Sequence, residues 1–158
     1  MIELDDINQD LIDLLQLDAR MSYRQLGEAI GLSAPAVAER IRKLEELGVI
    51  TGYRAVVDYE AIGFPLLCII RINSTSGAGT PLDEIIEACP EVIESNRVTG
   101  SESHVIRARV RTTAHLEELL HRLWEYGSSV TNIVTSSPVP SRAMNIRAAL
   151  ARAAELDH

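Results

Sequence analysis

The sequence predicts an α+β protein in two parts, a helical N-terminal part and a C-terminal part in which elements alternate as βαββαβ. Three observations support this prediction. Residues 22–52 have the pattern of two short amphipathic helices joined by a tight turn. Residues 66–136 alternate between short apolar runs of strand character and segments of helical periodicity. With 158 residues, 46% of them hydrophobic, the chain is long enough for one medium or two small domains with packed cores.

The first predicted helix covers residues 7–18. Its apolar residues recur at helical spacing and form one face: Ile7, Leu11, Leu14 and Leu15. Asp6 and Gln9 have the spacing of a capping box at its start. We expect this helix to complete a three-helix unit with the two helices that follow it.

The second and third helices are separated by residues that end one helix and begin the next. Ser22 with Gln25 forms a capping box, and Gly31 supplies the left-handed geometry that a sharp turn requires. Ser33 caps the third helix, and Pro35 fits its first turn. The predicted buried stripe of the third helix consists of Val37, Ile41, Leu44 and Leu47.

This helical pair has the layout of a helix-turn-helix that binds DNA. A recognition helix needs a small N-terminal tip that can enter the major groove, followed by long cations that reach phosphates or guanine edges. The residues assigned to DNA binding on this ground are Ser22, Tyr23, Arg24, Ser33, Ala34, Pro35, Ala36, Glu39, Arg40 and Lys43. The pattern leaves one alternative open, an ordinary helical pair with a solvated face.

The net charge of −8 is unusual for a DNA-binding protein, but the charges are unevenly distributed. Residues 1–18 contain six acidic residues and no basic one, whereas residues 19–57 contain six basic and four acidic residues. The segment with the predicted recognition helix is therefore positive. Because one copy can neutralise few phosphates, we expect weak, salt-dependent binding by a monomer and useful affinity only from several copies together.

The C-terminal part is predicted to form a four-stranded antiparallel sheet. Strands are expected at residues 66–73, 92–99, 104–111 and 130–136, and helices at 81–88 and 113–126. This is the order of the ferredoxin-like split unit. Both helices should cover one face, and the other face keeps apolar side chains that we expect a second subunit to cover. Arg107, Arg109 and Arg111 lie on one face of the third strand, either as a solvated or intersubunit charge row or as a DNA-wrapping surface.

These patterns divide the chain into four segments. Residues 1–52 form a helix-turn-helix (winged-helix-like) domain, and residues 53–65 a strand and linker, with strand character over residues 49–57. Residues 66–140 form the ferredoxin-like domain for oligomerisation and effector binding, and residues 141–158 a C-terminal tail. Because Ile146, Leu150 and Ala154 have helical spacing, the tail is either a marginal helix that docks on a neighbour or a frayed tail.

The sequence lacks the motifs of several kinds of catalytic and metal-binding site. We find no nucleophile elbow, phosphate loop, HExxH motif or convergent pair of carboxylates, so no catalytic residue is assigned and we predict no enzyme. His115 and His121 are six residues apart on one predicted helix and point in different directions, while Cys68 and Cys89 lack metal or redox spacing. We therefore expect no metal site and no cofactor, and two buried cysteines. The lack of a membrane-length apolar run and of a signal-peptide pattern predicts a cytoplasmic protein without a membrane partner.

Short blocks of the N-terminal part occur in a characteristic order, at residues 4–5, 10–12, 17–23, 31–33, 44–45 and 48–53. With the βαββαβ order that follows, they make the chain similar to the Lrp/AsnC family, the feast/famine transcription regulators, over roughly residues 2–140. The resemblance implies sequence-specific binding of double-stranded DNA and a homodimer through the C-terminal sheets that assembles into tetramers or octamers. It also implies a small-molecule effector, an amino acid or related metabolite, bound between subunits. The alternative is an oligomeric small-molecule-binding module or an enzyme without DNA binding.

The turn after the second strand of the C-terminal part differs from the family pattern. The family usually reads Gly, Asp, aromatic, Asp, aromatic there, whereas this chain reads Gly100, Ser101, Glu102, Ser103 and His104. The resemblance implies an effector pocket wall here, so these five residues are assigned to effector binding together with Thr135. An acidic pair could hold a ligand's ammonium group, and both aspartates are missing. We therefore expect weak or altered selectivity among free amino acids. His104 is either a ligand contact or a packed strand histidine.

Overall fold

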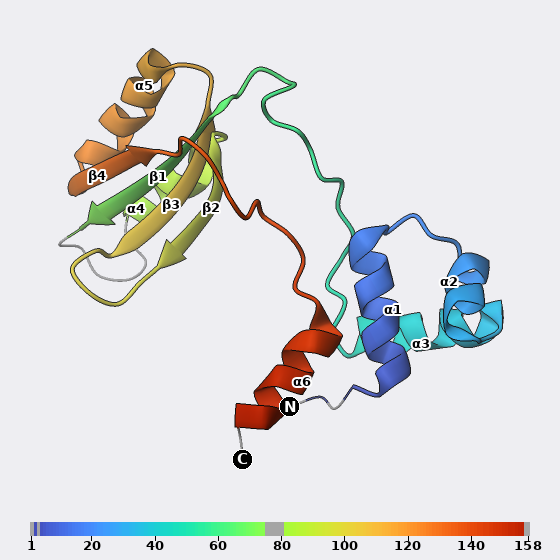
Figure 1. Cartoon of the computed structure of the whole chain (residues 1–158). Helices are drawn as coiled ribbons and strands as arrows, with labels where there is room; N and C mark the ends of the chain where they lie inside the picture. The colour runs from blue at the N-terminus through green and yellow to red at the C-terminus, as the bar shows by residue number, and fades with distance from the viewer. Residues whose placement is uncertain (1, 3, 75–80, 157–158) are drawn as a thin grey trace. The chain divides into compact units, whose positions relative to one another are not determined.

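The computed structural model describes residues 2, 4–74 and 81–156 and divides into two compact units, one of residues 1–56 with 139–158 and one of residues 57–138 (Figure 1). The described helices of the first unit are α1 (Asp6–Leu17), α2 (Tyr23–Ile30), α3 (Ala34–Glu46) and α6 (Ile146–Leu156). The second unit contains β1 (Leu66–Asn73), α4 (Pro81–Ala88), β2 (Val92–Arg97), β3 (His104–Val110), α5 (Thr113–Trp124) and β4 (Ser128–Ile133).

The core of the first unit lies where α1, α2 and α3 meet. Leu11, Leu26, Val37 and Ile41 are buried there. The predicted stripe of α3 is confirmed for Val37, Ile41 and Leu44, which are at most 1% exposed. It was wrong for Leu47, which is 48% exposed. Because α3 ends at Glu46 and Leu47 is its C-cap, no further helical turn carries Leu47 inward.

The predicted helix starts are confirmed for α2 and α3 but not for α1. Ser22 and Gln25 form the complete capping box of α2, and the Ser33 side chain accepts a hydrogen bond from the amide of Ala36. The capping box predicted from Asp6 and Gln9 was wrong. Because α1 begins at Asp6, its cap is the preceding residue, Asp5, which accepts from the backbone amide of Asn8 at 2.7 Å.

The strand expected over residues 49–57 is absent from the structure. No residue of this segment pairs with a strand in the described part of the chain, and Val56 is 98% exposed. Strand character alone does not make a strand, because a strand also needs a neighbour that accepts and donates its backbone hydrogen bonds. The first unit is therefore a helix-turn-helix without a wing, to which α6 is added.

The second unit confirms the predicted βαββαβ order. Its strands form an antiparallel sheet in the order β2-β3-β1-β4. The bounds of β1 and α4 agree with the prediction, whereas β2, β3 and α5 end one or two residues earlier than expected. The prediction of residues 130–136 for β4 was wrong, because β4 follows its pairing with β1, which runs from Asn73 opposite Ser128 to Cys68 opposite Ile133.

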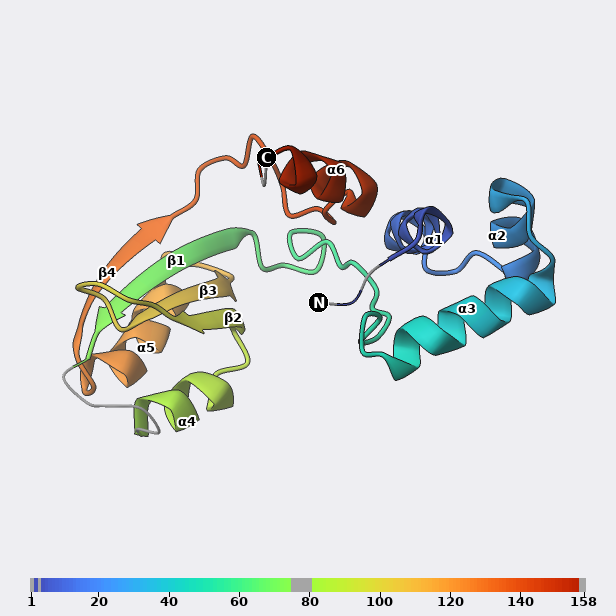
Figure 2. The same ribbon diagram turned by 90° about the horizontal axis from the view of Figure 1, so that it is seen from below.

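Helices α4 and α5 cover one face of this sheet (Figure 2). The predicted alternation of β3 is confirmed: its inward side chains, all at most 3% exposed, are His104, Ile106, Ala108 and Val110. Cys68 and Cys89 are buried free thiols whose pKa is raised by burial, so they act as small apolar side chains. The opposite face carries Leu67, Ile69, Val105 and Val130, of which Val130 is 56% exposed.

Glu91 links the segment before β2 to helix α5. Its side chain is 11% exposed and lies 2.9 Å from His115 Nε2 and 2.8 Å from Arg122 Nη2. Burial by itself raises the pKa of the Glu91 carboxyl, but the hydrogen bonds from His115 and Arg122 outweigh it and lower the pKa below its ordinary value of 4.5. The folded protein therefore binds a proton at Glu91 less readily than the unfolded chain does.

The stabilisation from Glu91 is expected to be present above pH 4.5 and to be lost as the pH falls through the lowered pKa. Replacing Glu91 by glutamine should lower the free energy of unfolding at neutral pH by about 1–2 kcal/mol. It should also flatten the dependence of that free energy on pH over the acidic range. Urea unfolding at a series of pH values measures both effects. An unchanged pH dependence in the variant would contradict the assignment.

Candidate nucleic-acid interface and effector turn

The turn between α2 and α3 is fixed by two glycines. Gly31 closes α2 in the left-handed region with φ of 74°, as predicted. Gly27, inside α2, was not singled out in the sequence. A Cβ atom there would lie 2.3 Å from the carbonyl oxygen of Leu32, and the Gly27 carbonyl accepts from the Leu32 amide at 2.9 Å. The turn therefore folds back onto α2 so closely that only glycine fits.

This turn presents the N-terminal tip of α3, residues 33–36. Ser33 and Pro35 are exposed, and Ala34 and Ala36 are half-buried. No side chain of the tip is larger than proline. The backbone of the tip can therefore approach a partner closely, which entry into a major groove requires.

Arg40 lies on α3 but is engaged with α1. Its Nη1 donates to Asp5 Oδ2 at 2.7 Å and to Asn8 Oδ1 at 3.0 Å. The hydrogen bond from Arg40, followed by that from the Asn8 amide, lowers the pKa of the Asp5 carboxyl. Arg40 thus holds the start of α1 against α3, a role that sequence reasoning missed because the partners are more than 30 residues apart.

The other predicted DNA contacts differ in how free their side chains are. Glu39 is bonded to Arg42, which also pairs with Glu46, so these three charges are satisfied along the helix. Lys43 is exposed and forms no ion pair with another described residue. At the start of α2, Tyr23 is 49% exposed and Arg24 pairs with Glu28 at 2.9 Å. Of the cations assigned on α3, Lys43 is the one available to a phosphate.

The predicted effector turn joins β2 to β3. Gly100 has a φ of 121°, a conformation that favours glycine, and Ser101 donates to Glu102 at 2.7 Å. Ser103 holds the turn to the end of β1: its amide donates to the Ile72 carbonyl at 2.7 Å, and its Oγ accepts from the Ser74 amide at 3.1 Å. Ser101 is therefore exposed on the turn, whereas Ser103 is held against the end of β1.

His104 points away from the open side of this turn. It is 3% exposed and lies on the helix-covered face of the sheet. Its Nδ1 is 2.9 Å from Ser103 Oγ, and its Nε2 is 3.0 Å from Asp83 Oδ1 on α4, where Arg97 also binds. Of the two readings left open by the sequence, the geometry is that of a packed strand histidine.

Thr135 is not brought to this turn within one chain. It is exposed and follows β4 next to Val134, whose amide donates to the Leu67 carbonyl near the start of β1. The turn lies at the other end of β1, beside Ile72. Five residues of strand separate Leu67 from Ile72, which is roughly 17 Å. Thr135 can therefore meet the turn only from another copy of the chain.

The remaining histidines, and Arg107 and Arg109 of the predicted charge row, have structural contacts. His115 bonds to Glu91, and His121 packs against Trp124 with ring centroids 4.9 Å apart. Within residues 2, 4–74 and 81–156, no group of three or more His, Cys, Asp or Glu side chains is placed to hold a metal ion. Arg107 pairs with Glu94 at 2.7 Å, and Arg109 lies over the Tyr59 ring at 5.5 Å.

No helix of the described residues is long and apolar enough to span a bilayer.

Comparison with known proteins assigns both parts of the chain. The AsnC-type helix-turn-helix domain matches residues 4–45, and the Lrp/AsnC ligand-binding domain matches residues 67–144. LrpA of Mycobacterium tuberculosis is 35% identical over 144 residues, covering 86% of this chain and 89% of LrpA. The transcriptional regulator YezC of Bacillus subtilis is 33% identical over 134 residues, covering 85% of this chain and 95% of YezC.

Solved structures agree with this assignment. Bacillus subtilis LrpC superposes with a TM-score of 0.84 at 28% identity, covering 89% of this chain and 100% of LrpC. A feast or famine regulatory protein of M. tuberculosis, solved with L-methionine, has a TM-score of 0.82 at 31% identity, covering 90% of this chain and 99% of that one. These relatives are named as regulators and not as enzymes. The chain belongs to the Lrp/AsnC family and is a DNA-binding transcriptional regulator.

Proposed function

We propose that α2 and α3 bind double-stranded DNA with residues 33–36 in the major groove. The observation that carries this proposal is the small, accessible tip of α3, held by a turn that only glycine at position 27 permits. The start of α2, with Ser22, Tyr23 and Arg24, then faces the sugar-phosphate backbone of the DNA. Lys43 reaches one of its phosphates. A gel shift with the DNA upstream of the chain's own gene tests the proposal. The DNA of the bacterial relatives lies in the cytoplasm, and we propose that this regulator acts there too.

We further propose that residues 1–52 form the DNA-binding domain and residues 66–140 the domain for oligomerisation and effector binding. The sheet face opposite α4 and α5 supports a dimer, because it carries partly exposed apolar side chains among arginines. A second copy of the same face can bury these apolar side chains. Higher assembly to a tetramer or octamer would bring together more DNA-binding heads.

A glutamate at Ile69, in the middle of this open face, is expected to prevent dimer formation. Although Arg107 lies opposite Ile69, burying a carboxylate in place of an apolar side chain would still cost desolvation free energy of several kcal/mol at each of two symmetric positions. Light scattering at micromolar concentration should report a dimer or larger for the wild type and a monomer for Ile69→Glu. Glu118→Lys, which changes an exposed charge on α5, is the control and should assemble normally. A wild-type monomer would contradict the proposed dimer.

An effector bound at the Gly100–Ser103 turn would complete this function. We propose a site between subunits, with the exposed Ser101 and the half-buried Glu102 on one chain and Thr135 supplied by another. L-methionine is the first candidate, because the related M. tuberculosis protein was solved with it. A ligand held between subunits changes the number of DNA-binding heads acting together only if its affinity differs between two assemblies.

Calorimetry with L-methionine and the other common amino acids is expected to give weak or undetectable binding. The reason is that Ser101 and Ser103 stand where the family pattern usually has two aspartates, so the ammonium group of a ligand would lack these acidic partners. Replacing Ser101 by aspartate should strengthen the binding measured for the wild type. Tight binding of one amino acid that survives Ser101→Ala, Ser103→Ala and His104→Ala would show that the pocket lies elsewhere.

A further inference from the structure

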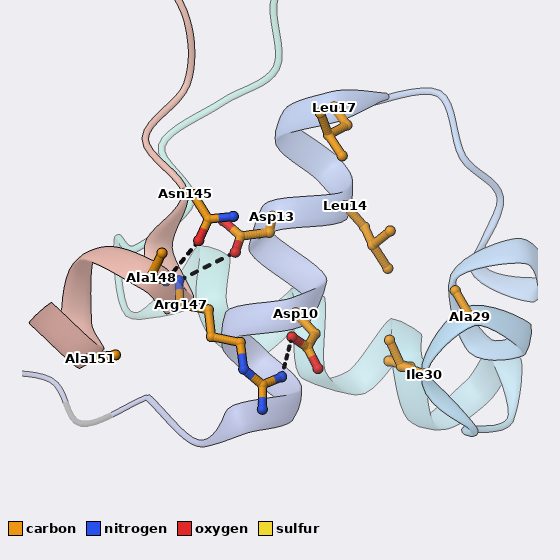
Figure 3. A pocket seen from close by; sticks show the side chains of 10 residues that line it. All are labelled: Asp10, Asp13, Leu14, Leu17, Ala29, Ile30, Asn145, Arg147, Ala148 and Ala151. Carbon is orange, nitrogen blue, oxygen red and sulfur yellow. Dashed lines mark hydrogen bonds and ion pairs between the residues drawn. The ribbon is translucent and has the colours of Figure 1, made fainter.

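The start of helix α6 is capped by a residue of helix α1. Asp13 Oδ1 accepts from the backbone amide of Ile146 at 2.7 Å. Asp13 Oδ2 accepts from the amide of Arg147 at 3.3 Å, as Figure 3 shows. The first amides of a helix have no partner within the helix and carry partial positive charge, so a carboxylate there stabilises it. Asn145 completes the cap, since its Oδ1 accepts from the Ala148 amide at 2.7 Å.

Side-chain charges join the same two helices. Arg147 Nη1 donates to Asp10 Oδ1 at 2.6 Å, and its Nη2 lies 3.8 Å from Asp6 Oδ2. Gln16 Nε2 donates to the Met144 carbonyl at 3.0 Å. The acidic residues of α1 are unfavourable for DNA binding. In this structure they form the docking site of α6.

Apolar packing contributes little to this docking. None of the described residues of α6 is buried, Ile146 is half-buried, and Leu150 is 42% exposed. A cavity of about 540 Å³ remains between α6, α1 and α2 above an apolar floor of Leu14, Leu17, Ala29 and Ile30. A helix of 11 residues is marginal on its own in water, so the polar contacts with α1 decide whether α6 is helical and docked.

The docking of α6 closes a loop in the chain. Helix α6 follows the C-terminal domain in sequence but belongs to the compact unit of the helix-turn-helix. The two domains are therefore connected twice, once through residues 57–65 and once through residues 134–145. Release of α6 would leave only the first connection.

We propose that α6 is a detachable electrostatic brace that, by its docking on α1, restricts the freedom of the DNA-binding head through a second connection to the C-terminal domain. The proposal rests on the proposed dimer and its DNA contacts. A head held by two connections has less freedom to lose when both heads of a dimer bind two half-sites at once. The brace therefore strengthens binding to a full operator and leaves the contact of one head with one half-site unchanged. Because exposed ion pairs are screened by salt, high ionic strength weakens it.

Hydrogen exchange in the full-length protein tests the docking. Arg147→Asp should speed exchange of the α6 amides at least tenfold at low salt, and wild-type exchange should accelerate as salt is added. The charge-swapped pair Asp10→Arg with Arg147→Asp should restore slow exchange in part. Arg152→Ala is the matched control, because Arg152 pairs with Glu155 on α6 itself. Equal exchange in the wild type and Arg147→Asp, or no recovery in the swapped pair, would overturn the brace.

Gel shifts test whether the brace strengthens DNA binding. They use DNA fragments whose half-sites have been located by footprinting. Arg147→Asp is expected to weaken binding to a two-half-site operator about tenfold and to leave binding to an isolated half-site within twofold. An equal loss on both fragments would show that α6 only stabilises the helix-turn-helix, and no loss on either would show that it does not restrict the DNA-binding head. If the wild type retards no DNA, the proposed function fails, whereas the exchange result still decides whether Arg147 holds α6.

Discussion

Replacing Gly27 by alanine is expected to open the helix-turn-helix and abolish specific DNA retardation. The new Cβ would lie 2.3 Å from the Leu32 carbonyl oxygen, and that atom belongs to backbone that no rotamer change can move. Alanine is the better helix former, so intrinsic propensity alone would predict stabilisation by up to about 1 kcal/mol. We expect the clash to dominate and to lower the free energy of unfolding by about 1–3 kcal/mol.

Urea unfolding and a gel shift on the same preparation measure the effect of Gly27→Ala. Glu28→Ala is the control, because it changes the neighbouring, exposed residue of α2 and should shift the free energy of unfolding by no more than about 0.5 kcal/mol. A stable Gly27→Ala protein with wild-type DNA affinity would mean that the turn does not fix the position of α3.

Removing Arg40 and Lys43 together is expected to abolish retardation of a specific fragment while leaving the assembly intact. The two single variants should differ in their effect on the melting temperature. Lys43→Ala should weaken DNA binding and leave the melting temperature unchanged. The salt dependence of the binding constant should fall by the amount expected for about one lost phosphate contact per head. Arg40→Ala should lower the melting temperature as well, because Asp5 and Asn8 lose their partner.

Gel shifts at several salt concentrations, thermal unfolding and light scattering separate these effects. Arg152→Ala removes one exposed positive charge from α6 and serves as the control for net charge. Wild-type DNA affinity in the double variant would remove α3 from the role of recognition helix. A normal melting temperature for Arg40→Ala would show that its contacts with α1 contribute nothing to stability.

The effector turn shows how far sequence reasoning extends at a site. The sequence located the turn and predicted the alternation of β3 that puts His104 on the same face as Ile106. That His104 bonds to Asp83 depends on where α4 lies over the sheet, and 21 residues separate the two side chains. Local pattern carries no information about such a distance, so the sequence left two readings of His104 open.

The sequence by itself determined the helix-turn-helix, the βαββαβ order and the cores of both units, because capping residues and apolar periodicity act over a few neighbouring residues. It also determined the family, which depends on the order of short motifs. Only the tertiary structure decided that Arg40 holds α1, that Gly27 contacts the turn and that residues 49–57 have no partner strand among the described residues. It also decided that Asp13 caps α6, 133 residues away along the chain. In each case the outcome depends on which distant backbone or charge folding brings within hydrogen-bond distance.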